Sequence, residues 1–330
     1  MLQFVRFDKK PVWVVPDNNI VSATFEIVEA GTGSFQMVLN VGNCCSNISE
    51  IIPWQSWVRF EDQYASWFGV VTSINDDKSL VTVTAHDMSI FWRRTAMIAG
   101  DYSGDSSDIL EKLANIPFIE GFTVNKKLSG VFIERSWLDK YVYVSDAIQD
   151  ILKANISYFV FADKIFIYPE DYSSGEVLEL FDDAFADAPN ILWDGLAYAD
   201  QVIVNGEVQA VAENVNIKNG YGVGTFLKYP LSRIVSDNNV KDFDSAYNVA
   251  SSSLKSSQNP LSFNGVNEVK LKSCSYLKNF LPSKLVKLKS SGYCLPVSDN
   301  VFKITKTVYN VSGQNLSIVL KPLGESEGVL

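Results

Sequence analysis

The chain has 330 residues, which is enough for about two or three domains of ordinary size. Apolar residues make up 47% of it and aromatic residues 12%, which excludes a disordered or fibrous protein. The net charge of −10 argues against a dedicated nucleic-acid-binding protein, which needs basic surface to neutralise phosphates. A single histidine, His86, leaves almost no room for a histidine-based catalytic triad or a multi-histidine metal centre.

The cysteines and the hydropathy pattern indicate a protein that folds in a reducing cytoplasm. No two of the four cysteines form a CxxC pair, so zinc-ribbon and thioredoxin-like sites are not supported. Adjacent Cys44 and Cys45 are therefore predicted to be small buried apolar residues. The first ten residues lack the apolar stretch of a secretion signal, and no stretch of eighteen residues is apolar enough to span a membrane.

The first ninety residues predict an antiparallel meander. Apolar side chains alternate with polar ones in the segment 34–41, as in a strand with one buried face. Polar loops rich in Asn and Asp separate the later segments and suit hairpin connections. Strands are expected over 20–28, 34–41, 57–60, 64–74 and 79–87. Short strands at this spacing are typical of a small barrel or sandwich.

Residues 96–198 predict a mixed α/β unit. Asp105 and its polar neighbours can cap a helix that begins near them, and a second helix is expected to begin near Ser145. The aromatic-rich segment 157–168 then predicts a hairpin that turns at Asp163.

Beyond residue 200 the strand pattern returns and is interrupted by one helix. A tight hairpin is expected over 202–208, and closing strands over 301–308 and 316–320. Between them, the period of apolar residues predicts a helix over 242–256. Its buried stripe is predicted to consist of Phe243, Tyr247, Ala250 and Leu254.

Three motifs invite a chemical interpretation, and each has a simpler one. His86 lies opposite the apolar face of its strand and has no partner in sequence, so it is predicted to be a surface or interface residue. The glycines of 220–224 lack the sixth-position glycine of a phosphate-binding loop and predict a turn. The alternation of Asp101, Ser103, Asp105 and Ser107 resembles calcium ligands but fits helix capping better, because Ser106 and Lys112 replace the required Gly and Glu.

Paired carboxylates and tryptophans keep a carbohydrate-related function open. Glycoside hydrolysis needs two acids across a sugar ring, and the candidate pairs are Glu61 with Asp62 and Asp182 with Asp183. Neighbouring acids in polar loops are more often simply solvated. Sugar rings could also stack on tryptophan, although core and subunit-contact roles are more common. The candidate tryptophans are Trp54, Trp57 and Trp67.

The segment 270–306 is strongly basic within an acidic chain. Tyr276, Phe280 and Tyr293 lie among its lysines, as in some nucleic-acid-binding segments. A basic surface that docks on acidic neighbouring subunits agrees better with the overall charge. The lysines are Lys270, Lys272, Lys278, Lys284, Lys287, Lys289, Lys303 and Lys306, against only Asp299. No residue of the chain is assigned a catalytic, cofactor-binding or metal-binding role.

Several segments together resemble the tail hub proteins of long-tailed phages. The family pairs a strand of the form GVVxxI with one reading roughly VTVxG/AxD, followed by a helix and arginines. Here the matching residues are WFGVVTSI (67–74) and VTVTAHDM (81–88) with Arg93 and Arg94. Further matches, in order, are the helix and hairpin of 145–169, the strand DQVIVNG (200–206), and the closing hairpin of 302–306 and 316–323.

The resemblance implies a β-rich α+β fold with two small antiparallel β-barrel domains and a mixed α/β domain. Its expected domains are a first β-barrel over 1–95, the mixed α/β domain over 96–198, a second β-barrel from 199–236 and 262–330, and a helical insertion over 237–261. Proteins of this family are similar to contractile-tail baseplate hubs and to the hub region of type VI secretion spikes. They form trimers that adapt the sixfold tail tube to a threefold tip.

The function implied is structural and not enzymatic, without cofactors. The chain would be a virion protein of the phage tail tip, assembled in the host cytoplasm, that lines or closes the DNA channel. Its expected partners are two further copies of itself, the distal tail protein or tail tube ring, the tape-measure protein, tip or receptor-binding proteins, and phage DNA in transit. The alternative is a tail-associated glycan or peptidoglycan hydrolase that uses a carboxylate pair.

Overall fold

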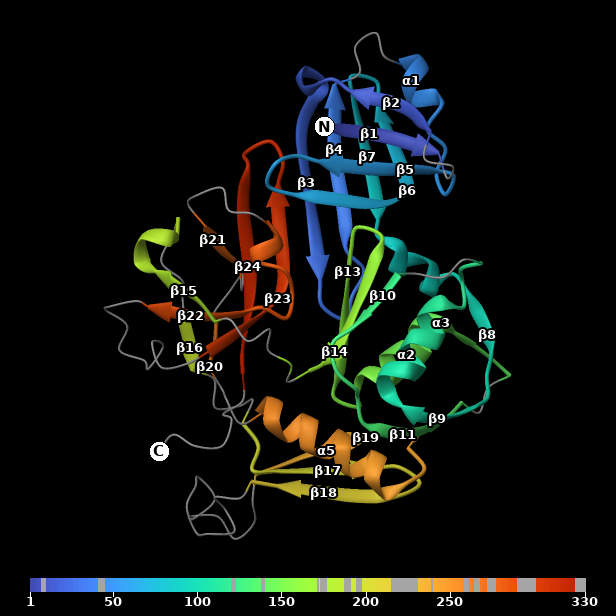
Figure 1. The fold of residues 1–330 in the computed structure, drawn as a ribbon, viewed down its shortest axis with the longest axis vertical. Coiled ribbons are helices and arrows are strands. Elements are labelled where there is room, and N and C mark those ends of the chain that lie inside the picture. The colour runs from blue at the N-terminus through green and yellow to red at the C-terminus, as the bar shows by residue number, and fades with distance from the viewer. Residues whose placement is uncertain are drawn as a thin grey trace.

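The protein is described from a computed structural model, shown in Figure 1. Its described residues are 1–6, 10–40, 45–119, 123–137, 140–170, 172, 177–186, 191–193, 198–214, 231–238, 240–257, 261–263, 268–271, 277–289 and 301–323. The loop 220–224, Cys44 and Lys272 lie outside these residues, as does the side chain of Cys45, so the predictions for them stay predictions.

A large sheet contains both the first and the last strands of the chain (Figure 1). Its hydrogen-bonded path runs β15-β22-β23-β3-β4-β7-β6-β5-β1-β2, and β21 and β24 join it beside β23. In chain order its strands are β1 (Leu2–Arg6), β2 (Pro11–Val15), β3 (Ile20–Val28), β4 (Ser34–Asn40), β5 (Ser56–Glu61), β6 (Ser66–Asp77), β7 (Leu80–His86), β15 (Val177–Phe181), β21 (Glu268–Leu271), β22 (Leu285–Lys289), β23 (Val301–Asn310) and β24 (Asn315–Pro322).

Antiparallel pairing of β23 with β3 fixes the C-terminal hairpin to the N-terminal meander. Tyr309 lies opposite Phe25 in this ladder, and the two rings are 5.3 Å apart. Phe25, Phe35, Phe60 and Trp67 continue the same aromatic cluster in the core. The alternation predicted for 34–41 places Phe35 and its neighbours of the same face in this core.

Short 3-10 helices and one small α-helix connect these strands. Two of the 3-10 helices bury no residue, whereas the one that follows β7 buries Trp92 in the core of the mixed α/β unit. The connecting helices are η1 (Asp17–Asn19), α1 (Cys45–Ser49), η2 (Met88–Arg93), η3 (Asp182–Ala184) and η6 (Leu277–Asn279).

The mixed α/β unit has its own core. Helices α2 (Ser106–Asn115) and α3 (Val144–Leu152) bury Leu110, Leu113, Ile148 and Ile151 against a small sheet. The predicted hairpin forms, and a parallel strand, β10, joins it. The strands of this unit are β8 (Ala96–Ile98), β9 (Asp101–Asp105), β10 (Thr123–Lys126), β11 (Phe132–Ser136), β12 (Tyr141–Tyr143), β13 (Ile156–Phe161) and β14 (Lys164–Pro169).

A third unit consists of a three-stranded sheet covered by a helix, at the bottom of Figure 1. Strands β17 (Gln201–Asn205), β18 (Gln209–Glu213) and β19 (Ser232–Ser236) pair with one another. The predicted hairpin forms, with its second strand beginning at Gln209. Elsewhere, β16 (Ile191–Trp193) pairs with β20 (Leu261–Phe263).

The helix of the third unit, α5 (Phe243–Ser257), does not bury the predicted stripe. Ala246, Val249, Ala250 and Leu254 face the sheet, whereas Phe243 and Tyr247 are exposed. The prediction was wrong for the two aromatic residues. Small residues on the neighbouring stripe let the helix approach β17 and β18 closely, and the large rings are left outside.

The β-rich α+β class is confirmed, with several sheets and a few helices. No closed barrel is detected among the strands that the structure describes. The predicted domain boundaries stay predictions. No described ladder joins the strands of 199–236 to those of 262–330; the latter extend the sheet of the N-terminal meander or pair with β16.

Candidate functional site

Charged side chains gather where the large sheet, the mixed α/β unit and α5 meet. We call this cluster the polar junction. It draws on residues that are far apart in sequence and come together only through the pairing of β23 with β3. Its members are Glu26, Glu29, Tyr168, Glu170, Lys303, Lys306 and Lys321.

Lys303 is the centre of the polar junction. Its Nζ lies 2.5 Å from Oε1 of Glu29 and donates to the backbone oxygen of Glu170 at 2.8 Å. The same Nζ lies 5.3 Å from the ring centroid of Tyr168, whose hydroxyl donates to Oε1 of Glu29 at 2.9 Å. The side chain of Lys303 is only 3% exposed and that of Glu29 only 10%. Each charge is thus compensated by the other and by further polar contacts, as buried ions require.

Glu170 joins the junction to α5 and β24. Its Oε1 lies 2.9 Å from Nζ of Lys321, and its Oε2 accepts a hydrogen bond from Oγ of Ser252 at 3.2 Å. Burial acts to raise the pKa of Glu170, but attraction by Lys321 and Lys303 and the hydrogen bonds outweigh it and hold this pKa below its usual value. The pKa of Tyr168 is raised, mainly by burial and then by Glu29. The ionised Glu170 therefore ties three elements together.

A second buried cluster connects α3 and β11 to the third unit. Arg135 on β11 is 1% exposed, and Asp150, Asp237 and Asp242 act to raise its pKa against the larger effect of burial, which lowers it. Nζ of Lys153 lies 2.7 Å from Asp150 and 3.5 Å from Asp237. With the polar junction, this cluster provides polar contacts between all three units of the fold.

His86 occupies the half-exposed face of β7, as predicted. Its Nδ1 lies 2.9 Å from Oγ1 of Thr72. Burial, followed by repulsion from Arg93, lowers the pKa of His86, and Glu26 opposes this. The hydrogen bond described for His86 is to the hydroxyl of Thr72, and none to a carboxylate is among its described contacts.

Asp87, next in the chain, is a buried acid that sequence reasoning missed. Its carboxylate accepts hydrogen bonds from the backbone N–H of Gly33 at 2.6 Å and of Ser89 at 2.9 Å, and from the hydroxyl of Ser89 at 2.6 Å. It caps η2 and holds it to the turn between β3 and β4. Burial raises the pKa of Asp87 to about 6. The aspartate of the VTVTAHD motif could have been singled out, but its burial could not.

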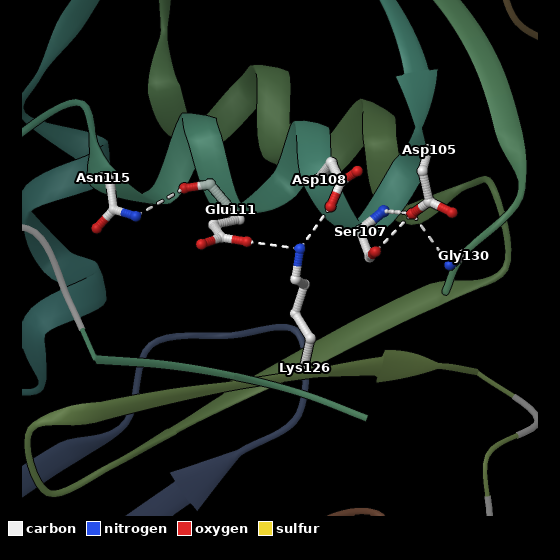
Figure 2. A network of polar contacts seen from close by, with 7 residues as sticks. All are labelled: Asp105, Ser107, Asp108, Glu111, Asn115, Lys126 and Gly130. Atoms are coloured by element: carbon white, nitrogen blue, oxygen red, sulfur yellow. Dashed lines mark hydrogen bonds and ion pairs between the residues drawn. The ribbon is translucent and has the colours of Figure 1, made fainter. Parts of the chain in front are cut away.

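Of the alternating residues 101–107, Asp105 caps α2 through Ser107, as Figure 2 shows, whereas Asp101 and Ser103 belong to β9. Oδ1 of Asp105 accepts hydrogen bonds from N and Oγ of Ser107, and from N of Gly130 at 3.0 Å. The predicted capping role is confirmed for Asp105. In the same view Lys126 bridges Asp108 and Glu111. Among the described residues, no group of three or more His, Cys, Asp or Glu could hold a metal ion.

The candidate carboxylate pairs do not converge on a ligand site. Oδ1 of Asp62 accepts hydrogen bonds from N of Tyr64 at 2.7 Å and N of Ala65 at 2.6 Å, and Oδ2 accepts one from the hydroxyl of Tyr309 at 3.0 Å. Asp62 therefore holds the loop between β5 and β6. Glu61 pairs with Arg59 at 3.0 Å on the surface.

The other pair and the cavity near Glu61 do not complete a hydrolase site either. Asp182 and Asp183 are exposed at the start of η3. A cavity of about 280 Å³ lies between β5, β6 and the turn after β13, and its lining includes Glu61 and Asp163. Neither Asp62 nor the Asp182–Asp183 pair lines this cavity.

The tryptophans do not form a sugar-binding platform. Trp57 and Trp67 are buried, as the core interpretation predicts. Only Trp54 of the three has an exposed ring, and its backbone φ is 67°.

Part of the basic segment is neutralised within the chain. Lys303, Lys306 and Lys289 pair with Glu29, Glu26 and Glu179. Phe280 is buried, so it does not offer a ring to nucleic-acid bases. Lys270 and Lys278 of the same segment are exposed, and the basic docking surface stays a prediction.

The fold is similar to that of phage tail proteins. The structure of a tail protein from Neisseria meningitidis matches with a TM-score of 0.66 and 13% identity, over 97% of this chain and 95% of that one. Prophage tail protein gp18 from Listeria monocytogenes matches with a TM-score of 0.65 and 13% identity, over 98% of this chain and 95% of that one. The resemblance noted in the sequence is thus confirmed for the fold.

A type VI secretion component extends the likeness beyond phages. The Escherichia coli protein c3393, described as similar to the T4 tail proteins gp27 and gp5, matches with a TM-score of 0.56 and 11% identity, over 94% of this chain and 74% of that one. No family model and no curated protein matches the sequence. No helix within the described residues has the length and hydropathy needed to span a membrane.

Proposed function

We propose that this chain is a structural hub of a phage tail tip or baseplate. Three copies would form a ring that adapts the sixfold tail tube to a threefold tip and lines or closes the DNA channel. The observation that carries the proposal is the match of fold over nearly the whole of this chain and of two phage tail proteins.

The internal coupling of the fold supports a mechanical role. Buried ion pairs are costly to form and specify one arrangement of the parts they join. Here one such pair, Lys303 with Glu29, joins β23 to the end of β3. A hydrogen bond from Lys303 and the partly exposed pair of Lys321 with Glu170 extend the contact to the mixed α/β unit, and a hydrogen bond from Ser252 extends it to α5. A subunit built in this way passes a displacement of one unit to the others, as a tail tip must when adsorption leads to genome release.

The proposal includes the neighbours of such a hub. They are a distal tail protein or tail tube ring above it, the end of the tape-measure protein, tip or receptor-binding proteins below it, and DNA in transit. The net charge of −10 would let DNA pass without adhering. The place of action would be the virion tail tip, after assembly in the host cytoplasm. No enzymatic step is proposed.

Light scattering across a concentration series tests the hub. The expected mass is three times the 36.7 kDa of one chain, because closed threefold assembly is what the proposed role requires. Negative-stain images of the same sample should show rings with threefold symmetry. A dimer, or a monomer at every concentration, contradicts the proposed self-assembly.

A further inference from the structure

A two-stranded ribbon leaves one apolar face uncovered by the rest of the described chain. Strands β8 and β12 pair so that Ile98 lies opposite Tyr141 and Ala96 opposite Tyr143. Met97 between them is buried in the core of the mixed α/β unit. On the outer face Ile98 is 72%, Tyr141 59% and Tyr143 52% exposed. Figure 1 shows β8 at the edge of the molecule, beyond α3.

Trp54 lies near the start of this ribbon in a strained conformation. Its φ of 67° places a bulky residue in the left-handed region, which such side chains rarely adopt. Its N–H donates to the backbone oxygen of Val71 at 2.7 Å, and its ring meets the edge of Phe91 at 5.9 Å. The residue is nevertheless 37% exposed. Core packing alone does not explain why a strained backbone presents an indole to solvent.

A cation lies over an exposed aromatic residue both at Trp54 and at the Tyr141 end of the ribbon. The guanidinium of Arg94 lies 5.4 Å from the ring centroid of Trp54, and Nζ of Lys140 lies 5.6 Å from that of Tyr141. Arg94 stands two residues before Ala96, so the chain runs directly from the Trp54 end into β8. We call this surface the aromatic face; it consists of Trp54, Arg94, Ile98, Lys140, Tyr141 and Tyr143.

We propose that the aromatic face binds a polypeptide segment in which carboxylate side chains alternate with apolar ones. Apolar side chains would cover Ile98 and the tyrosines, and carboxylates would pair with Arg94 and Lys140, whose charges already lie against aromatic rings. Trp, Tyr and Arg are the residue types that dominate binding energy at protein interfaces. Two cations on a chain of net charge −10 are too few to hold a nucleic acid.

The inference rests on the proposed function only because a tail protein is expected to contact proteins other than copies of itself. Its test is independent of trimer formation. Two labelled peptides of equal length are compared by fluorescence anisotropy, one alternating glutamate with leucine and phenylalanine, the other alternating lysine with the same residues. The acidic peptide is expected to bind saturably, and the basic one at least about tenfold more weakly.

Variants locate the binding. Arg94→Glu and Tyr141→Asp are each expected to weaken binding of the acidic peptide at least about tenfold. Phe181→Asp on β15 and Arg59→Glu on β5 are matched controls, because they change an exposed aromatic residue and an exposed arginine elsewhere. Both controls should leave the affinity unchanged.

Trp54→Gly separates binding from folding. Glycine adopts positive φ freely, and this gain offsets the greater freedom of the unfolded chain and the lost contact with Phe91. The free energy of unfolding is therefore expected to stay close to that of the wild type while the peptide affinity falls. A purely structural role for Trp54 predicts lower stability instead.

Four outcomes overturn the inference. They are no saturable binding, equal binding of the two peptides, equal loss in the control variants, and variants of the aromatic face that change only the mass in light scattering. The last outcome would assign the face to a second copy of the chain. Conversely, peptide binding by a chain that does not form trimers would contradict the hub and leave the aromatic face intact.

Discussion

Lys303 and Glu29 form a buried ion pair at 2.5 Å although they stand near opposite ends of the sequence. Lys303 belongs to β23, and Glu29 follows β3 directly. The pair forms because β23 lies antiparallel to β3, and Tyr168 and the backbone of Glu170 complete its surroundings. It thereby fastens the C-terminal hairpin and the mixed α/β unit to the N-terminal meander.

Removing one partner of this pair should destabilise the fold strongly. Lys303→Met leaves the carboxylate of Glu29 buried without its cation, which typically costs about 3–5 kcal/mol of unfolding free energy. Urea denaturation measures the effect. The double variant Lys303→Met with Glu29→Gln should recover most of the lost unfolding free energy, because neither charge remains. As a control, Arg59→Met breaks an exposed pair, with side chains 51% and 55% exposed, and should cost less than about 1 kcal/mol.

Gly69→Ala should disrupt the pairing of β6 with β7. A Cβ at this position would collide with the backbone oxygen of His86 and with the ring of Trp67, and the backbone of β7 cannot move without breaking its ladder. We expect little soluble folded protein, or a loss of more than about 3 kcal/mol. Gly100→Ala is the matched control, because its Cβ would meet nothing within 4 Å. An equal effect of the two changes would contradict the steric argument.

Local periodicity was sufficient to predict individual elements. The alternation in 34–41 predicted β4, and capping residues predicted the start of α2 next to Asp105. The hairpin over 157–168 forms as β13 and β14. These features depend on neighbours in sequence, so a sequence pattern records them.

Long-range relations could not be predicted in the same way. Nothing in the pattern around Lys303 indicates Glu29, because the register of β23 on β3 depends on the whole sheet. The prediction of the buried stripe of α5 was wrong for a related reason. Periodicity located a helix, but the choice of buried stripe depended on how closely β17 and β18 could approach, which favoured Ala246 over Tyr247.

The carboxylates of the two candidate hydrolase pairs should behave as structural residues. Asp62→Ala removes the carboxylate that accepts three hydrogen bonds and holds the loop after β5. We expect the free energy of unfolding to fall by about 2 kcal/mol. Glu61→Ala should cost less than about 1 kcal/mol, because its pair with Arg59 is exposed. Peptidoglycan turnover by the wild-type chain is expected to be at background. Turnover that falls by orders of magnitude in any variant of Glu61, Asp62, Asp182 or Asp183 would instead support the hydrolase.

Asp87 should make stability depend on pH in an unusual direction. Its pKa is raised by burial from 3.8 to about 6 in the fold, so the folded state binds the proton more tightly than the unfolded state. The stabilisation from protonation is fully present below pH 3.8 and is lost as pH rises through 6. The difference amounts to about 3 kcal/mol between these limits.

Asp87→Asn isolates this contribution. The N–H groups of Gly33 and Ser89 donate to different oxygens of Asp87, so the single amide oxygen keeps only one of these two hydrogen bonds. That loss does not depend on pH, and the amide does not titrate, so the comparison across pH still isolates the carboxyl. Unfolding free energies of both proteins are measured by urea denaturation from pH 4 to pH 7. Their difference at each pH removes the contribution of all other acids, which titrate in both proteins. The wild type should lose stability relative to the variant as pH rises through about 6. A difference that stays constant over this range would show that the carboxyl of Asp87 titrates as it does in the unfolded chain.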